Sequence, residues 1–529
     1  MFSLTEFSIW RTILLAALLS IFLVFSRIFY NLYLNPLRKF PGPVRWAASA
    51  FPSAVSLCKG DLVHDIQRLH LKYGDIVRVG PNTLSFTNPD ALRDIMVHRP
   101  GHQTFQKDGT WWDVIPGQAE SVVSLPTGRD HARVRRALSV GFTEKTLIAQ
   151  ESMLKKYVDL LVAKLKDIVV VEGKQGKGSI VNIADWYNYT TFDIIGDLMF
   201  AESFDCLRDS QYHPWITVIF ENLRAIAYLI SIRLVYRPLE TMLFACLPAK
   251  ATQAMDDHYS MSCQKIHRRL GLETSRPDIM ASVLQNGGLR DEKATMTGSK
   301  DSNPNEGSMT INEIEGSFTT LIIAGSETTA TSLIGSTSSL VNNPDKLKKL
   351  VDEIRGTFPT EEDITLSRLK DLPYLNAVIS ETMRLCPPVP VGLAHVVPKG
   401  GDTVCGHWLP GGTHVSVATY ALHRDPARFY ESEKFLPERR LASSINDPSS
   451  VFKDDVRNAV QGFGLGKRQC LGMQLAYAEL RFILARMAWS FDMERAETKD
   501  GLYPWSELRT FQLLEKRPFD IIIREPASR

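Results

Sequence analysis

The sequence lacks both an excess of one charge and any paired arrangement of cysteines. Its 61 basic and 59 acidic residues leave a formal net charge of +2, which excludes the strongly basic surface that nucleic-acid binding requires. Its seven cysteines form no C-x-x-C pair and no zinc-finger spacing. An odd number of scattered cysteines favours a reducing compartment over a disulfide framework. The sequence also contains no internal repeat.

The composition is that of an ordinary globular protein with a large core, because 44% of the 529 residues are hydrophobic and 23% are charged. Helical periodicity dominates from about residue 128 to 380. Polar breaks predict surface loops at 172–178 and 286–308, and short β-prone runs predict strands at 76–79, 83–86 and within 387–440. The sequence therefore predicts a mainly α fold with a minor β part, in the α+β class.

The N-terminus is strongly apolar. No charged residue occurs between residues 12 and 26, and the apolar stretch runs from about 7 to 33 if Arg11 and Arg27 extend their charged ends towards lipid headgroups. A cleaved signal peptide is the competing interpretation, but the apolar run is long and no small-x-small cleavage site follows it. We therefore expect a single-pass signal anchor.

This assignment divides the chain into three segments. Residues 1–34 are the expected transmembrane anchor, the proline-rich residues 35–60 are a stiff hinge, and residues 61–529 are the folded domain. The C-terminal flank of the apolar stretch is basic, with Arg27, Arg38 and Lys39. The positive-inside rule therefore places the folded domain in the cytosol.

The most informative stretch is 463–472, which reads Phe-Gly-Leu-Gly-Lys-Arg-Gln-Cys-Leu-Gly. Gly464 and Gly466 permit a tight backbone turn. A helix expected to begin at about Cys470 would direct free N–H groups and its positive dipole end at the sulfur, which stabilises a thiolate. The alternative is a buried structural cysteine. Five fixed positions should match by accident in only about one chain in ten thousand of this length.

This stretch resembles the haem-thiolate loop of the cytochrome P450 family. The resemblance implies haem b with the Cys470 thiolate as axial iron ligand, an electron-rich ligand that favours cleavage of the O–O bond. It also implies that Phe463 packs on the lower face of the ring, that Gly466 lies beneath the ring, and that Arg468 reaches a haem propionate.

A second motif lies in a helix expected over 310–343, which begins with a capping-box pattern. Its middle reads Ala-Gly-Ser-Glu-Thr-Thr at 324–329, and a glycine there costs about 1 kcal/mol. The motif is similar to the oxygen-binding helix of the same family. That resemblance implies that Gly325 gives room for dioxygen, that Thr328 hydrogen-bonds its distal oxygen, and that Glu327 relays protons. A tolerated helix kink is the alternative.

Three charged residues form a further ordered set. Glu381 and Arg384 lie three apart on one helical face, and Arg439 follows in Phe-Leu-Pro-Glu-Arg at 435–439. Such pairs are usually solvated. Members of the family carry the same ordered set, and the resemblance implies a buried Glu-Arg-Arg network with a structural role.

Basic side chains are expected to grip the haem propionates. His131 and Arg135 lie one helical turn apart, matching a helix that commonly does so in the family, although many members have tryptophan where this chain has His131. A solvated basic face is the alternative. His395 stands where the family normally presents an arginine. If His395 takes that role, haem retention should weaken as the pH rises past the histidine pKa.

The resemblance covers nearly the whole chain and implies the cytochrome P450 fold, with 61–529 as a haem-thiolate monooxygenase domain. Two stretches, 31–43 and 392–441, are similar to filamentous-fungal microsomal members such as the isotrichodermin-type hydroxylases, which tailor terpenoids or polyketides in secondary metabolism. This implies oxidation of a lipophilic small molecule by dioxygen and NADPH-derived electrons at the endoplasmic reticulum membrane. The implied electron donors are NADPH–cytochrome P450 reductase, docking on a basic face that includes Lys467, and cytochrome b5.

Two other functions fit the cysteine motif. A haem-thiolate isomerase or dehydratase needs no reductase, but such enzymes often lack the distal threonine, so Thr328 argues against them. A non-catalytic membrane haem protein has no use for proton delivery, which the neighbouring Glu327 and Thr328 imply. The apolar region 214–247 is expected either as a lid near the bilayer or as an ordinary pair of core helices. An apolar pocket wall is expected from Ile322, Ile323, Val389, Val391 and Phe511.

Overall fold

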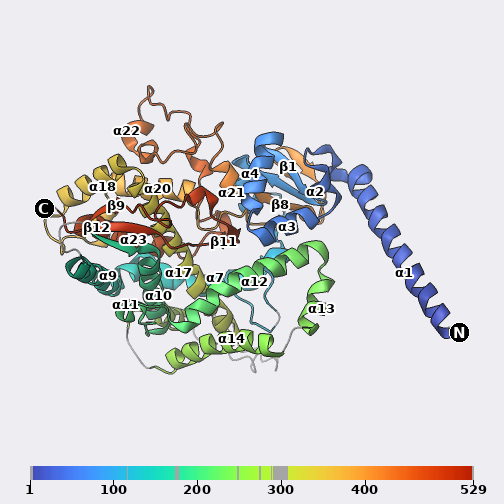
Figure 1. Cartoon of the computed structure of the whole chain (residues 1–529), viewed down its shortest axis with the longest axis horizontal. Helices are drawn as coiled ribbons and strands as arrows, with labels where there is room; N and C mark the ends of the chain where they lie inside the picture. Colours follow the sequence, from blue (N-terminus) through green and yellow to red (C-terminus); the bar gives the residue numbers. More distant parts are fainter. Residues whose placement is uncertain are drawn as a thin grey trace.

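The computed structural model describes residues 4–115, 117–172, 178–246, 249–272, 276–287, 289 and 308–526. The predicted loops at 172–178 and 286–308 lie for the most part outside these residues. The described chain is mainly helical with short strands gathered into small sheets, as the α+β prediction required (Figure 1).

The N-terminal helix α1 (Leu4–Phe29) projects away from the rest of the molecule (Figure 1). The segment Trp10–Leu34 contains an 18-residue window with a mean hydropathy of 2.3, none of which is buried, so the segment is long and apolar enough to cross a membrane. The following turn is attached to the folded domain, because the Asn31 side-chain amide donates to the Ala48 carbonyl (2.8 Å). The Arg78 guanidinium in turn donates to the Asn31 carbonyl (2.9 Å).

The strands form one five-stranded sheet and three smaller ones. The five-stranded sheet has the order β1 (Ile76–Gly80), β2 (Thr83–Phe86), β8 (His414–Val417), β5 (His395–Val396) and β3 (Gln106–Lys107), and only the β2–β8 pair is parallel. The smaller sheets are β4 (Ser179–Asn182), β12 (Asp520–Arg524) and β9 (Asp492–Arg495); β6 (Asp402–Val404) and β7 (His407–Leu409); and β10 (Thr510–Phe511) and β11 (Leu513–Leu514). The predicted strands at 76–79 and 83–86 are confirmed.

The long helix α17 (Ile311–Val341) runs through the core. It begins with the predicted capping box, in which the Glu313 N–H donates to Thr310 Oγ1 (3.2 Å) and the Thr310 N–H donates to Glu313 Oε2 (2.9 Å). Its packing partners are α10 (Ile183–Phe200), α14 (Ala249–Leu270), α20 (Pro373–Leu385) and α23 (Met473–Ser490). Nearly every residue of α10 is buried, which places α17 and α10 at the centre of the domain.

The remaining helices surround this centre. Those before α17 are α2 (Val44–Ala48), α3 (Phe51–Lys59), α4 (Leu62–Tyr73), α5 (Asp90–Met96), α6 (Gly109–Trp112), α7 (Arg129–Ser139), α8 (Glu144–Ala149), α9 (Glu151–Glu172), α11 (Cys206–Asp209), α12 (Pro214–Tyr236), α13 (Pro238–Cys246) and α15 (Ile279–Gly287). Those after it are α18 (Pro344–Thr357), α19 (Leu366–Leu369), α21 (Thr419–Leu422) and α22 (Ala442–Ile445). The described part of the apolar region, 214–246, contains α12 and α13, and α12 packs against α3 and α6.

The predicted ion network is present and completely buried. Arg384 and Arg439 contact the same Glu381 carboxylate, at 2.7 and 2.9 Å, and all three residues have 0% exposed surface. Arg439 also pairs with Asp455. Arg384 donates in addition to the carbonyls of Ser432 (2.5 Å) and Lys434 (2.9 Å). Because every charge has a partner, the network fixes α20 to the chain segment that leads to the cysteine loop.

Removing one partner of this network should destabilise the domain strongly. Glu381→Gln leaves two buried guanidinium groups without their shared carboxylate, so we expect it to lower the free energy of unfolding by about 3–5 kcal/mol and to reduce haem content. The matched control is Asp352→Asn, which breaks the exposed Lys348–Asp352 pair and should cost less than about 1 kcal/mol. Urea unfolding measures both variants, and equal stability of the two would contradict the structural role of the network.

Candidate functional site

The cysteine loop is closed by its own backbone. The Cys470 N–H donates to the Phe463 carbonyl (2.8 Å), so the six residues between them turn back on themselves. Gly464 and Gly466 have φ of +69° and +67°, the left-handed region that glycine adopts at little cost. Gly466 is also required by packing, because a Cβ there would lie 2.3 Å from the Met96 carbonyl oxygen at the end of α5.

Cys470 is exposed at the protein surface, although many protein atoms pack around its sulfur. Helix α23 begins at Met473, with Gly472 as its N-cap, rather than at about Cys470 as predicted. The Cys470 N–H is already used to close the loop, and the Gly472 N–H, rather than its own, points at the sulfur. Burial raises the pKa of the Cys470 thiol, whereas the Gly472 N–H and the charge of Arg135 lower it.

An accessible stripe on α17 lies among buried neighbours. Ala324 is exposed and Thr328, one turn later, is partly exposed, whereas Glu327 and Thr329 are buried. The Thr328 hydroxyl donates to the Ala324 carbonyl (2.7 Å). Helix α17 packs against α23, which directly follows the cysteine loop. A flat cofactor between this stripe and Cys470 is what the sequence resemblance predicts.

Gly325 has a packing partner that the sequence did not predict. A Cβ at this position would lie 2.7 Å from Ile195 Cδ1 of α10, so the glycine allows α17 and α10 to pack closely. This side of Gly325 faces α10, and Ala324 is the motif residue that is exposed. The expected role of Gly325, to leave room for dioxygen, stays a prediction.

Glu327 is 2% exposed and forms an ion pair that links three parts of the chain. Its Oε2 lies 2.9 Å from Lys516 Nζ, and Lys516 also donates to Asn188 Oδ1 of α10. Burial raises the pKa of Glu327, and the charge of Lys516 partly offsets this effect. Lys516 was missed at the level of sequence, because it lies in no motif and is far from Glu327 along the chain.

Five basic side chains influence one another near the cysteine loop. They are Lys107, His131, Arg135, His395 and Arg468, four of which the sequence predicted as cofactor-binding and one of which, Lys107, it did not. Arg468 donates to the Leu125 carbonyl (2.7 Å) and to Thr127 Oγ1 (2.8 Å). Lys107 donates to the Val123 carbonyl. Within the described chain, Lys107, Arg135 and Arg468 form no ion pair with a carboxylate.

The pKa values in this basic cluster are all lowered. Burial, followed by the charge of Arg468, lowers the pKa of Lys107 to about 7. Burial and the neighbouring cations lower the pKa of His131 to about 3 and that of His395 to about 4, and burial together with Arg135 lowers that of Arg468 to about 10. A concentration of buried positive charge without an acidic partner fits a group with two carboxylates, which is what the propionates of haem provide.

Two predicted cofactor-binding residues, His395 and Phe463, have partners within the protein. His395 donates its Nδ1–H to the Leu393 carbonyl (2.8 Å), so in the neutral ring Nε2 is an acceptor and cannot donate to a carboxylate. Phe463 packs against Tyr477 of α23, with ring centroids 5.0 Å apart, and its packing on the lower face of the cofactor stays a prediction.

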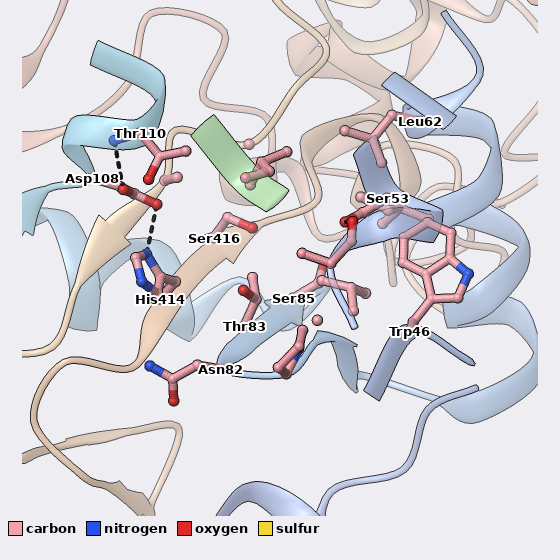
Figure 2. A pocket seen from close by; sticks show the side chains of 18 of the residues that line it. Trp46, Ser53, Leu62, Asn82, Thr83, Ser85, Asp108, Thr110, His414 and Ser416 are labelled. Atoms are coloured by element: carbon pink, nitrogen blue, oxygen red, sulfur yellow. Dashed lines mark hydrogen bonds and ion pairs between the residues drawn. The ribbon is translucent and has the colours of Figure 1, made fainter. Parts of the chain in front are cut away.

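A separate cavity of about 530 Å³ lies between the five-stranded sheet, α3, α12 and the end of α1 (Figure 2). It is lined by Trp46, Leu62, Val391 and other apolar residues, with the Asp108–His414 pair (2.6 Å) on one wall. Neither Cys470 nor Thr328 lines it, so this cavity is distinct from the space in front of the cysteine loop. Its residues from the last turns of α1 put it next to the apolar helix that is long enough to cross a membrane.

Comparisons with known proteins agree on one family. A family model described as Cytochrome P450 matches residues 41–517. The chain is 36% identical over 511 residues to cytochrome P450 monooxygenase atr2 of Stereocaulon alpinum, which covers 96% of this chain and 95% of the relative. It is 38% identical over 494 residues to cytochrome P450 monooxygenase astJ of Aspergillus oryzae, covering 93% of each. It is 37% identical over 495 residues to averantin hydroxylase of Dothistroma septosporum, covering 93% of this chain and 87% of the relative.

The pKa of Lys107 predicts how haem retention depends on pH. The haem propionates would favour the charged form of the Lys107 amine, so the pKa of Lys107 in the haem-bound protein lies above about 7. The contribution of Lys107 to haem binding is therefore complete below pH 7 and is lost as the pH rises through this haem-bound pKa. We expect haem loss to accelerate about tenfold or more above pH 7. Haem transfer to an acceptor protein measures the rate.

Two variants separate the contributions. Lys107→Met should lose haem at a high rate at every pH, whereas His395→Gln should keep the wild-type profile, because a pKa of about 4 leaves His395 neutral above pH 6. A Lys107→Met variant with the wild-type pH profile would contradict the assignment. A His395→Gln variant with a flat profile would restore the role that the sequence first suggested for this residue.

Proposed function

This chain belongs to the cytochrome P450 family and is an oxidoreductase of the monooxygenase class, and we propose that it hydroxylates a lipophilic small molecule. The reaction inserts one atom of dioxygen into an unactivated C–H bond. The observation that carries the proposal is the closed loop that presents an accessible Cys470 just before α23, the helix that packs against α17.

The proposed cofactor is haem b, with Cys470 as the iron ligand and Lys107, His131, Arg135 and Arg468 around the propionates. When bound, haem supplies the binding and activation of dioxygen. The chain's own contribution begins with the Gly472 N–H and Arg135, which favour the anionic form of the sulfur. Gly466 and Gly325 contribute by allowing the loop and α17 to pack closely against their neighbours.

Thr328 and Glu327 are the proposed groups for proton transfer. In the structure the Thr328 hydroxyl donates to the Ala324 carbonyl. Its oxygen retains lone pairs that can accept a hydrogen bond from a group on the accessible face of α17. Glu327 is the next residue and is paired with Lys516 behind the helix. We infer that Glu327 supplies protons and that Thr328 presents them at the accessible face of α17.

The proposed substrate is a terpenoid or polyketide of fungal secondary metabolism. This is supported by similarity to fungal monooxygenases, one of which is named averantin hydroxylase. The substrate would approach through the 530 Å³ cavity beside the end of α1, which is mainly apolar and of a size that accommodates such molecules. The proposed location is the endoplasmic reticulum membrane, with α1 as a single-pass anchor and the remaining chain in the cytosol.

Electrons are proposed to come from NADPH through NADPH–cytochrome P450 reductase, with cytochrome b5 as a second donor. Lys467 lies on the cysteine loop and is exposed, which is the placement that an acidic redox partner would require. A reductase-independent isomerase or dehydratase would show no dependence on NADPH, so reconstitution separates this class from the proposed one.

Isotopically labelled dioxygen tests the proposed reaction. The reconstituted enzyme is supplied with NADPH, reductase and a panel of terpenoids and aromatic polyketides, and products are analysed by mass spectrometry. We expect one labelled oxygen atom per product molecule, and no product without NADPH. Product that forms without NADPH, or that carries no label, would contradict the monooxygenase function.

The same assay tests the role of Thr328. Thr328→Ala should lower product per NADPH by about tenfold or more and release the lost oxygen as hydrogen peroxide, because proton transfer by a positioned group contributes at least that much. The control is Thr320→Ala, two turns earlier on the same helix, where the hydroxyl makes the same kind of bond to the Gly316 carbonyl (2.8 Å). Unchanged product per NADPH in Thr328→Ala would show that this hydroxyl is not used.

A further inference from the structure

Lys516 joins the distal acid to a buried polar network. It follows β11, and its amine contacts Glu327 Oε2 of α17 (2.9 Å) and Asn188 Oδ1 of α10. The side chains of Lys516 and Glu327 are 9% and 3% exposed. A buried lysine and a buried glutamate are costly unless they are paired, and here each has the other.

Lys516 determines which group donates and which accepts in each hydrogen bond of this network. Lys516 can only donate, so it must meet the oxygen of the Asn188 amide. The Asn188 nitrogen then donates to the Tyr212 hydroxyl (2.9 Å), and that hydroxyl donates its own proton to Asp185 Oδ1 (2.7 Å). The chain of bonds from Asp185 therefore holds the Lys516 amine in one place, directed at Glu327.

Two atoms in this region have no hydrogen-bond partner in the described chain. Glu327 Oε1 is buried without one, on the residue that directly precedes Thr328. Trp505 Nε1 is also buried without one, and Trp505 lines a crevice of about 20 Å³ together with Lys516, Ser338 and Tyr503. That volume accommodates one water molecule, and the Lys516 side chain supplies a hydrogen-bond donor to a crevice whose lining is otherwise mainly apolar.

We propose that Lys516 is the residue that resupplies Glu327 with protons, and that it takes each proton from water in the adjoining crevice. The Lys516 ammonium gives one proton to the Glu327 carboxylate, which leaves a neutral amine on Lys516 and a neutral carboxyl group on Glu327. Glu327 passes the proton towards Thr328. A proton from bulk solvent, carried by the water in the crevice, then returns Lys516 to its ammonium form. Lys516 acts through Glu327 and is therefore a positioning and proton-supplying residue, and the proposal rests on the monooxygenase function proposed above.

The physical environment is suited to such a transfer. Burial lowers the pKa of Lys516, although the charges of Glu327 and Asp185 partly restore it, and burial raises the pKa of Glu327. The two pKa values are therefore drawn towards each other, which makes the neutral pair accessible from the ionised one. Arginine at position 516 would keep the positive charge but would not release its proton, because its pKa exceeds 12.

The first test reads the protonation of Glu327 by infrared spectroscopy of the haem-loaded full chain. In wild type and in Lys516→Arg we expect no protonated-carboxyl C=O stretch from Glu327, because a cation is paired with it. Lys516→Met should produce this band, and the double variant Lys516→Met/Glu327→Gln should lack it. Glu479, whose pKa burial raises to about 8, contributes the same band to all four proteins and cancels in the differences.

The second test measures where electrons go when no substrate is added. With NADPH and reductase, dioxygen leaves either as water, which needs proton delivery for O–O cleavage, or as hydrogen peroxide. We expect Lys516→Met and Lys516→Arg to lower the rate of water formation by about 100-fold and to release peroxide instead. The control is Lys348→Met, whose lysine is 73% exposed in a surface pair, and it should match wild type.

The outcomes separate the proposal from the function on which it rests. If Lys516→Arg forms water at the wild-type rate while Thr328→Ala does not, the function stands and the lysine is not a proton source. If Lys516→Met shows no new carboxyl band, the pairing with Glu327 does not control its protonation and the proposal is wrong. If wild type consumes no dioxygen with NADPH, the proposed function fails, and the infrared result still decides whether Lys516 controls Glu327.

Discussion

The structure depends on keeping a negative charge on Cys470 at a place where burial opposes it. Burial raises the pKa of this thiol, and a thiolate there needs compensation from the protein as well as from the iron. The Gly472 N–H and the charge of Arg135 provide it. The tight loop that brings the sulfur to this point requires the left-handed backbone of Gly464 and Gly466. The buried network around Glu381 then holds the neighbouring chain in place.

The same problem of buried charge is met differently on the two sides of the expected cofactor. Near the propionate positions, Lys107, Arg135 and Arg468 are concentrated without a carboxylate in the described chain, so the anionic cofactor completes their neutralisation. Behind α17, Glu327 already has its partner in Lys516. The basic side chains therefore lack a protein partner where the cofactor is proposed to bind, whereas the carboxylate is paired where proton transfer is proposed.

Local signals made much of this predictable from sequence. The capping box at Thr310 and Glu313, the two strands at 76–79 and 83–86, the apolar N-terminal helix and the Glu-Arg-Arg network all follow from short patterns whose physics is local or shared by the family. Lys107 and Lys516 were not predictable, because each reaches the site through tertiary packing and neither lies in a motif. For the same reason the contact that Gly325 makes with Ile195 of α10 could not be predicted from the sequence.

The most direct test of the account is the reduced, carbon-monoxide difference spectrum of the full chain beside that of Cys470→Ser. Thiolate ligation predicts a strongly red-shifted Soret band in wild type, and its disappearance in the variant, because serine does not supply the soft, electron-rich ligand. A wild-type band at the position typical of histidine-ligated haem, or a band that persists in Cys470→Ser, would contradict the assignment of Cys470 and with it the function proposed for this chain.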